Sequence, residues 1–99
     1  MRIVIPVDAD DLEEAKITTI DEASFWLFFE MEGGKPSNEK FYETWQEIDN
    51  VEIVILKSQT ENVWQFMEQN IAVLVTSTQM YFEDIVEGYI FKELYDLNI

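Results

Sequence analysis

The residues in this sequence that are best suited to chemistry are five carboxylates that follow a short apolar segment near the start of the chain. They are Asp8, Asp10, Asp11, Glu13 and Glu14. Clustered carboxylate oxygens suit a hard cation such as Mg²⁺ or Ca²⁺. The spacing, however, lacks the glycine and the closing glutamate of an EF-hand loop. We interpret the cluster first as a solvated polar loop and keep a divalent cation site as the alternative.

Covalent catalysis has few suitable groups in this chain. The sequence contains no histidine to act as a base, so a serine–histidine–aspartate triad cannot be built. The serines are Ser24, Ser37, Ser58 and Ser77. Cysteine is also absent, which excludes disulfides, thiolate metal sites and cysteine nucleophiles. We predict a protein that is not an enzyme, with no catalytic residue, no bound metal and no cofactor.

The net charge of −15 limits the partners that the chain can bind. Acids outnumber bases by 13 to 4 in residues 1–50 and by 8 to 2 in residues 51–99. A negative field spread along the whole chain repels nucleic acids, anionic lipids and anionic cofactors, and it favours cationic partners. We therefore predict neither nucleic-acid binding nor membrane binding.

Length and hydropathy indicate one globular unit. The 99 residues are 47% hydrophobic and 14% aromatic, which is enough to bury a single core. No apolar run approaches the roughly 18–20 residues that span a bilayer. The segment from Met1 to Pro6 is too short for a signal peptide. We expect one domain, residues 1–99, in the cytoplasm.

The secondary structure that positions the carboxylates and the other candidate residues begins with two predicted strands. Residues 2–7 form a β-branched run, and residues 23–32 alternate. The odd positions of the second run are all apolar, whereas the even positions are apolar only in the middle, at Trp26 and Phe28. This pattern predicts an inner strand that is covered on both faces at its centre. Gly33 and Gly34 then predict a hairpin turn and an antiparallel return.

The return segment allows two interpretations. Residues 40–45 fit an edge strand, which we favour, because Phe41 and Trp45 then share a face. Alternatively, Asn38 caps a short helix that runs to Ile48, since Phe41, Trp45 and Ile48 also have helical spacing.

The second half of the chain predicts alternating strands and helices. Residues 51–56 and 71–76 are short apolar runs typical of buried strands, and the 14 residues between them suit a crossover that joins parallel strands. Within this crossover, Thr60 is the expected cap of a helix over residues 61–69.

A long final helix is expected over residues 79–94, capped by Ser77 or Thr78. We expect its Gly88 to let the helix lie close to the sheet. Its core-facing positions are predicted to be Phe82, Val86, Tyr89, Ile90 and Leu94. The fold class is thus α/β, with a mixed, mainly parallel sheet, an N-terminal hairpin and helices packed on the sheet.

Three stretches carry a resemblance to a known family. They are "MRIVIPVDAD", "TIDEASFWLFFEMEGGK" and "ENVWQFMEQNIAVLVTSTQMYFEDIVEGYIFKEL". Together with the order of elements they resemble the nitrogenase iron–molybdenum cofactor accessory family, the NifX-type domains with a ribonuclease-H-like motif. The resemblance implies a non-catalytic accessory protein.

The chain departs from that family where a cofactor would bind. The family's histidine, phenylalanine, glycine and arginine fall on Thr19, Ile20, Asp21 and Glu22, and Ala23 alone agrees. The family is taken to carry iron–sulfur cofactors or their precursors, which need soft or imidazole ligands. The resemblance therefore implies a degenerate member that keeps the fold and has lost its cofactor ligands.

A ligand pocket is expected at the carboxyl ends of the strands, where open α/β sheets bind ligands. The candidate cofactor-binding residues are Asp8, Thr19, Asp21, Glu22, Lys57 and Thr60. The leading hypothesis is a non-catalytic accessory or binding protein that acts through protein contact. The alternative is a domain that binds a small ligand or a divalent metal in this pocket.

The chain also has more large rings than a small two-layer domain needs to bury. They are Tyr42, Trp45, Trp64, Tyr81, Tyr89 and Tyr95. One interpretation places them at the edge of the core. The other makes them an exposed aromatic face that binds a protein partner or a second copy of the chain.

Overall fold

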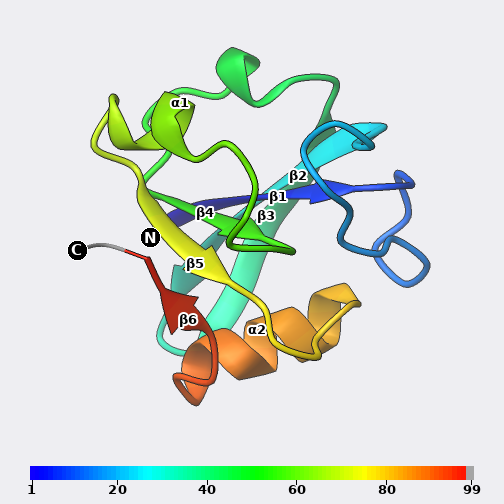
Figure 1. Cartoon of the computed structure of the whole chain (residues 1–99). Coiled ribbons are helices and arrows are strands. Elements are labelled where there is room, and N and C mark those ends of the chain that lie inside the picture. The colour runs from blue at the N-terminus through cyan, green and yellow to red at the C-terminus, as the bar shows by residue number, and fades with distance from the viewer. Residues whose placement is uncertain (98–99) are drawn as a thin grey trace.

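A single six-stranded sheet runs through the molecule, in the order β3-β2-β1-β4-β5-β6 (Figure 1). The computed structural model describes residues 1–97. The strands are β1 (Arg2–Val7), β2 (Phe25–Glu32), β3 (Lys35–Tyr42), β4 (Ile53–Leu56), β5 (Ala72–Val75) and β6 (Tyr95–Asp96). The α/β class and the N-terminal hairpin are therefore confirmed.

The sheet is mixed, but the prediction that it is mainly parallel is wrong. β1 pairs in parallel with β4, and β4 with β5. The β1–β2, β2–β3 and β5–β6 pairs are antiparallel. The antiparallel share is large because the hairpin strands β2 and β3 have eight residues each, whereas β4 and β5 have four.

Strand β2 is the inner strand that its alternating pattern predicted. Leu27 and Phe29 point into a core on one face of the sheet. Trp26 and Phe28 point into a second core on the other face. Glu32, at the end of the strand, is exposed. Residues 25–29 are five large apolar residues in a row. Four of them are buried, and Phe25 at the start of the strand is half-buried.

Two thin layers cover the sheet. Helix α2 (Phe82–Ile90) and the segment 8–17 cover one face, with Phe82, Ile85 and Ile17 in its core. The 3₁₀ helix η1 (Trp45–Glu47) and the single-turn helix α1 (Trp64–Met67) cover the other (Figure 1). No helix in the described part of the chain is long and apolar enough to cross a membrane.

The hairpin resolves the ambiguity over the return segment. Gly33 and Gly34 have φ angles of 60° and 78°, the left-handed values that a two-residue hairpin turn requires. The return is the edge strand β3, but it starts at Lys35 and ends at Tyr42, so the favoured strand is confirmed with shifted bounds. Asn38 does not cap a helix. It lies in a β-bulge with φ 55°, where the register with β2 shifts.

The crossover helix is shorter than expected, and its predicted cap is wrong. Helix α1 is a single turn that begins after Val63, which makes no side-chain cap. The hydroxyl of Thr60 lies 2.8 Å from the hydroxyl of Ser58 and so stays within its own loop. Hydrogen bonds from the loop thus take the place of the first helical turns that the sequence pattern suggested.

The final helix also differs from its prediction in three respects. It begins at Phe82 without a side-chain cap, because the Ser77 N–H donates to Gln79 Oε1 in a separate turn. Ile85, which was not predicted, is 1% exposed, whereas Ile90 is 41% exposed. A Cβ on Gly88 would lie 3.1 Å from Gln79 Nε2 and 3.2 Å from a methyl carbon of Leu94. The atoms that crowd this position most closely therefore belong to the segments that flank the helix.

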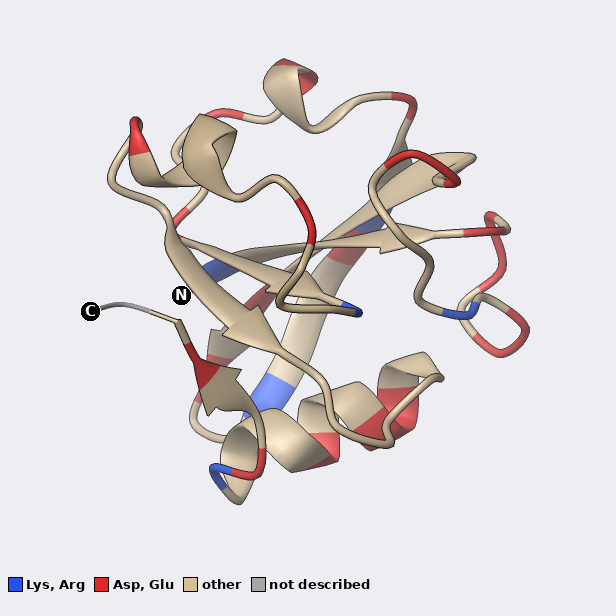
Figure 2. Cartoon of the chain, in the orientation of Figure 1, with Lys and Arg blue, Asp and Glu red and all other residues tan. Residues whose placement is uncertain are grey.

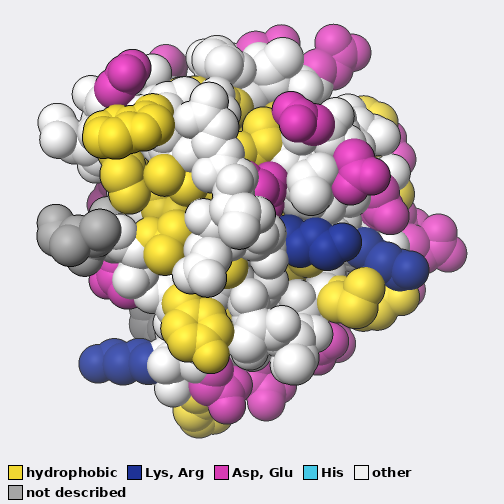
Figure 3. All heavy atoms as spheres, viewed as in Figure 1, with side chains coloured by type: hydrophobic (Ala, Val, Ile, Leu, Met, Phe, Trp, Pro, Cys, Tyr) yellow, Lys and Arg dark blue, Asp and Glu magenta, His cyan; other side chains and the backbone are white. Residues whose placement is uncertain are grey.

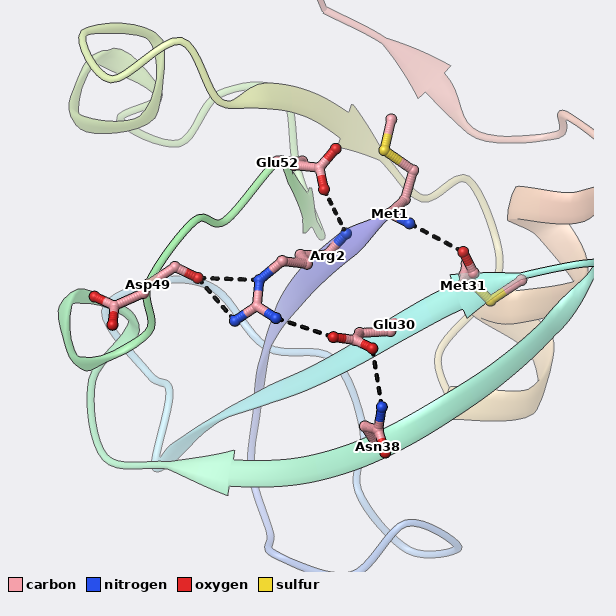
Figure 4. Close-up of polar contacts among 7 residues, drawn as sticks. All are labelled: Met1, Arg2, Glu30, Met31, Asn38, Asp49 and Glu52. Atoms are coloured by element: carbon pink, nitrogen blue, oxygen red, sulfur yellow. Dashed lines mark hydrogen bonds and ion pairs between the residues drawn. The ribbon is translucent and has the colours of Figure 1, made fainter.

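Arg2 fastens the strands together at one end of the sheet (Figure 4). Its Nη1 lies 2.9 Å from Glu30 Oε1, and its Nε and Nη2 donate to the Asp49 carbonyl oxygen at 3.1 and 2.9 Å. The guanidinium carbon lies 4.6 Å from the centre of the Phe28 ring. Asn38 donates to the second oxygen of Glu30 at 2.9 Å. Strands β1, β2 and β3 and the loop before β4 thus meet around one cation.

Candidate functional site

The candidate site is the edge of the sheet where the parallel strands end. Because β1, β4 and β5 are parallel, their carboxyl ends share one edge. The segments 8–24, 57–63 and 76–81 leave from this edge. Ligands of open α/β sheets bind at such edges, because loops there can place donors around a common point.

Asp8 makes two hydrogen bonds to backbone atoms at the base of the first loop. Its N–H donates to the Lys16 carbonyl oxygen at 3.1 Å, and its Oδ1 accepts from the Lys16 N–H at 2.9 Å. These bonds close the acidic loop at its base. One oxygen of the Asp8 carboxylate thus accepts from a backbone donor, and its role in ligand binding stays a prediction.

Thr19 and Glu22 hydrogen-bond to each other in the second part of the segment 8–24. The Thr19 hydroxyl donates to Glu22 Oε1 at 3.0 Å and accepts from the Glu22 N–H at 3.3 Å. Asp21, between them, is exposed. The Ser24 N–H returns to the Val7 carbonyl oxygen at 3.0 Å, so this turn lies at the end of β1. The predicted residues Thr19, Asp21 and Glu22 are thus together, as neighbours in one turn.

The loop after β4 makes its own small network. The hydroxyls of Ser58 and Thr60 lie 2.8 Å apart, and the Thr60 N–H donates to Ser58 Oγ at 3.2 Å. Lys57 is exposed at the start of the loop. Lys57 and Thr60 are therefore at the predicted edge, but the Thr60 hydroxyl is already engaged by a neighbour.

Glu61 joins the two loops, and no sequence argument had singled it out. Its Oε1 accepts from the Ile20 N–H at 2.6 Å, and its Oε2 accepts from the Ser58 N–H at 3.0 Å. The residue is half-buried. Two backbone donors from different loops are thus satisfied by one carboxylate. An anion that came to this point would find both of these donors occupied.

A sequence signal for Glu61 does exist. Both loops contain a Ser or Thr followed three residues later by Glu, the pattern of a capping box. In the first, Thr19 and Glu22 bond to each other; in the second, Glu61 reaches back to the Ser58 N–H. The second carboxylate oxygen of Glu61 then connects the second box to the first, through Ile20.

The remaining acids do not assemble a metal centre. Within residues 1–97, no group of three or more histidine, cysteine, aspartate or glutamate residues could hold a metal ion. Figure 2 shows the acids spread over the loops and α2. The acidic segment after β1 uses Asp11 to accept from the Glu13 N–H at 2.9 Å, which is a turn contact.

Three solved structures share this fold at low sequence identity. PH0822 has a TM-score of 0.77 and 17% identity, over 97% of this chain and 96% of that chain. A protein of Methanocaldococcus jannaschii provisionally named a dinitrogenase (MJ0327) has a TM-score of 0.76 and 16% identity, over 99% and 95%. A Thermotoga protein provisionally named NifB and placed in the DUF35 family (TM1290) has a TM-score of 0.74 and 18% identity, over 99% and 94%.

These likenesses establish the fold and no more, because identities of 16–18% carry no site chemistry with them. No family model and no curated protein sequence matches the chain. Two of the three proteins have provisional names that relate to nitrogenase. The chemistry of this edge must therefore be judged from its own residues.

The residues present do not fit an iron–sulfur or iron–molybdenum group. Such clusters are held by thiolates or imidazoles, and the sequence contains neither cysteine nor histidine. The two backbone donors from Ile20 and Ser58 are bound by Glu61, whose negative charge opposes an anionic cluster.

Proposed function

We propose that this chain is a non-catalytic accessory protein, related to the NifX-type nitrogenase cofactor proteins, that acts by contact with another protein and holds no cluster itself. Its strand order, β3-β2-β1-β4-β5 with an antiparallel hairpin followed by parallel strands, supports a ribonuclease-H-like motif. The solved structures with the same fold and nitrogenase-related names support the relationship.

The observation that carries the proposal is the Glu61 bridge. At the edge where a bound group would be expected, the protein's own carboxylate takes the donors of Ile20 and Ser58. The side chain acts as a fixed internal anion that holds two loops together. An edge closed in this way suits a scaffold better than a carrier.

A cluster-transfer experiment tests this proposal. The protein is mixed anaerobically with a preformed thiolate-ligated [4Fe–4S] cluster and then passed over a gel-filtration column. We expect a colourless protein peak, whereas an apo-ferredoxin treated in the same way elutes brown. Brown colour that co-elutes with this protein in stoichiometric amount would overturn the proposal.

The surface for protein contact is an apolar strip on the α1 face of the sheet. Figure 3 shows hydrophobic side chains that follow one another over α1, β5 and β6. Trp64 on α1 is 69% exposed and Tyr95 on β6 is 63% exposed. Trp45, in contrast, is buried against Phe66, with ring centres 4.9 Å apart, so the expected aromatic face is only partly built. Large exposed rings along one apolar strip favour an interface.

Sedimentation distinguishes a second copy from a different partner on this strip. The protein is compared with a Trp64→Ser, Tyr95→Ser double variant across a wide range of concentrations at moderate salt. A wild-type dimer that the double variant loses assigns the strip to self-association. A monomer throughout excludes self-association on the strip, whereas a dimer that both proteins form removes the strip from the proposal.

A further inference from the structure

A second surface lies on the opposite face of the sheet, between α2, the acidic loop after β1 and the start of β3. It is a groove of about 1190 Å³. The loop is held against the beginning of α2 by the Ile17 N–H, which donates to the Met80 carbonyl oxygen at 2.9 Å, and by a β-bridge between Lys16 and Tyr81. The acidic loop and the start of α2, which form two sides of the groove, are therefore held together by backbone contacts.

The floor of the groove is apolar and opens at one end. Phe82, Val86 and Ile90 follow each other at a spacing of four, so they form a row along one side of α2. Phe82 and Val86 are buried, whereas Ile90 is half open to solvent. Phe91, which also lines the groove, is 67% exposed. Ile90 and Phe91 thus expose apolar surface at the end of the helix. A molecule that covers this surface is stabilised by the hydrophobic effect.

The walls are acidic on both sides. The loop contributes two carboxylates and α2 contributes three: Glu13, Glu14, Glu83, Asp84 and Glu87. No lysine or arginine lines the groove, and the one ion pair in residues 1–97 joins Arg2 to Glu30 elsewhere. The nearby Lys16 instead lies over the Tyr81 ring, 5.9 Å from its centre. Five unpaired carboxylates around low-dielectric walls concentrate a negative potential in the groove.

The chemistry excludes most occupants. A bare divalent cation is disfavoured, because no three acids of the described residues converge as metal ligands. Nucleic acid and anionic lipid are repelled by the charge of the walls. A second copy of this chain would bring another net charge of −15 to the same place. A segment that carries both positive charge and apolar side chains can pair with the acidic walls and also cover the apolar floor.

We infer that this groove binds a basic amphipathic segment of a partner protein, with lysine or arginine side chains facing the acidic walls and an apolar side chain resting on Ile90 and Phe91. The partner segment would bind as an amphipathic helix in a groove, and the acidic walls of the groove would select for positive charge along its sides. The inference rests on the protein-contact part of the proposed function and names the chemistry of the partner.

A model peptide tests the inference with the full-length chain. The probe is a synthetic amphipathic helix made of leucine and lysine, and its control is a peptide of the same composition in an order that spreads leucine around the helix. Nuclear magnetic resonance of the isotope-labelled protein locates the binding site, and fluorescence anisotropy measures the affinity. We expect shift changes in α2 and residues 12–14, and weaker binding of the control peptide.

Charge-matched variants separate the groove from the general charge of the protein. Glu83→Gln with Glu87→Gln removes two groove charges, and Glu47→Gln with Glu68→Gln removes two exposed charges from the other face. We expect the groove pair to weaken peptide binding by at least about tenfold and the control pair by less than about twofold. A third variant, Ile90→Ser with Phe91→Ser, is expected to weaken it as well. Thermal melts check that all variants are folded.

Each outcome has one meaning. Equal losses in the two charge pairs, or shift changes centred on Trp64 and Tyr95, would overturn the inference. Peptide binding in the groove by a protein that also takes up an iron–sulfur cluster would keep the inference and overturn the cluster-free function. A colourless protein that ignores both peptides would overturn the inference alone.

Discussion

Glu61 is half-buried and serves as acceptor for two loops, which makes it the most demanding single polar residue of the candidate edge. Glutamine at this position keeps the size of the side chain but presents one amide NH₂ to a backbone N–H. We expect Glu61→Gln to lower the free energy of unfolding by about 1–3 kcal/mol, because one donor loses its acceptor. Urea denaturation measures this change.

The matched control for that substitution is Asp21→Asn. It removes the same charge from an exposed position in the same turn region. Surface changes of this kind alter stability by less than about 0.5 kcal/mol. If both variants lose the same small amount, Glu61 does not hold the loops together, and the main support for a closed edge is lost.

Arg2 concentrates four contacts on one side chain, counting its bonds to Glu30 and Asp49 and its place over Phe28. Arg2→Met keeps the apolar stem and removes the planar fork. We expect a loss of about 1–2 kcal/mol in urea denaturation, since the pair is partly solvated and its charge is screened. Arg2→Lys is expected to recover only part of this, because lysine cannot donate in two directions at fixed angles.

Lys57→Met provides the reference for Arg2→Met, because Lys57 is exposed and loses the same charge. In a chain this acidic, removal of any base also increases the net negative charge. The difference between the two variants therefore isolates the contacts of Arg2. A Lys57 variant as unstable as the Arg2 variant would mean that net charge, and not geometry, explains the effect.

At the scale of elements, the hairpin turn specifies the register of β2 and β3. Gly33 has φ 60°, and a Cβ added there meets no atom within 4 Å, so any penalty is conformational and not steric crowding with neighbours. We expect Gly33→Val to cost about 1–2 kcal/mol, because a β-branched residue resists the left-handed region. Gly33→Asn should be nearly neutral, since asparagine is favoured in such turns. Thermal unfolding of the two variants makes the comparison.

Equal destabilisation by valine and asparagine would contradict the turn type. It would mean that the hairpin tolerates no side chain at this position for a reason that the backbone angles do not show. Equal stability would mean that the turn adapts its shape and that register is set elsewhere, for example by the bulge at Asn38.

The elements also show where sequence reasoning succeeds. The alternation in β2 predicted its two buried faces correctly, because eight consecutive residues report the same environment. The short helix α1 was overestimated, because its apolar spacing also fits a loop that Glu61 holds in place. A period of 3.6 read over nine residues cannot separate these possibilities, since the deciding bond comes from Ile20, 41 positions away.

The candidate edge illustrates the same limit. The sequence correctly placed the carboxyl ends of the parallel strands at one edge, because this follows from the order of strands, whereas ligand binding there stays a prediction. It did not identify which side chains are already used within the fold. One oxygen of Asp8 closes its own loop, and Glu61, which is not among the predicted site residues, joins two loops. The capping-box pattern around Glu61 accounts for its bond to the Ser58 N–H, whereas its bond to the Ile20 N–H, 41 positions away, has no local signal.

At the scale of the whole molecule, the edges of the sheet follow from charge and length. β3 is an exposed edge strand that contains Lys35, Pro36 and Lys40, and these residue types discourage pairing with another sheet. β6, at the other edge, has only two residues. The fold thus limits strand-to-strand association. The apolar strip on the α1 face and the acidic groove beside α2 are therefore the surfaces on which we expect partners to bind.

The excess of acids should make stability depend on salt. A net charge of −15 is confined to a radius of gyration of 11.9 Å. At about 0.01 M salt the screening length is about 30 Å, so most carboxylates repel one another across the whole molecule. At about 0.3 M it is shorter than the radius, and repulsion falls to near neighbours. We expect the midpoint of thermal unfolding to rise by about 4–8 °C over this range, which corresponds to about 1 kcal/mol for a domain of this size.

A variant with fewer groove charges identifies the origin of that rise. The triple variant Glu13→Gln, Glu83→Gln, Glu87→Gln removes three of the five carboxylates that line the groove. We expect it to melt higher than the wild type at low salt and to gain less from added salt, because repulsion has been removed in advance. Sodium chloride and tetramethylammonium chloride should act alike if screening is responsible. A larger effect of sodium would indicate a bound cation, and a falling midpoint would show that attractive pairs, not repulsion, dominate the surface.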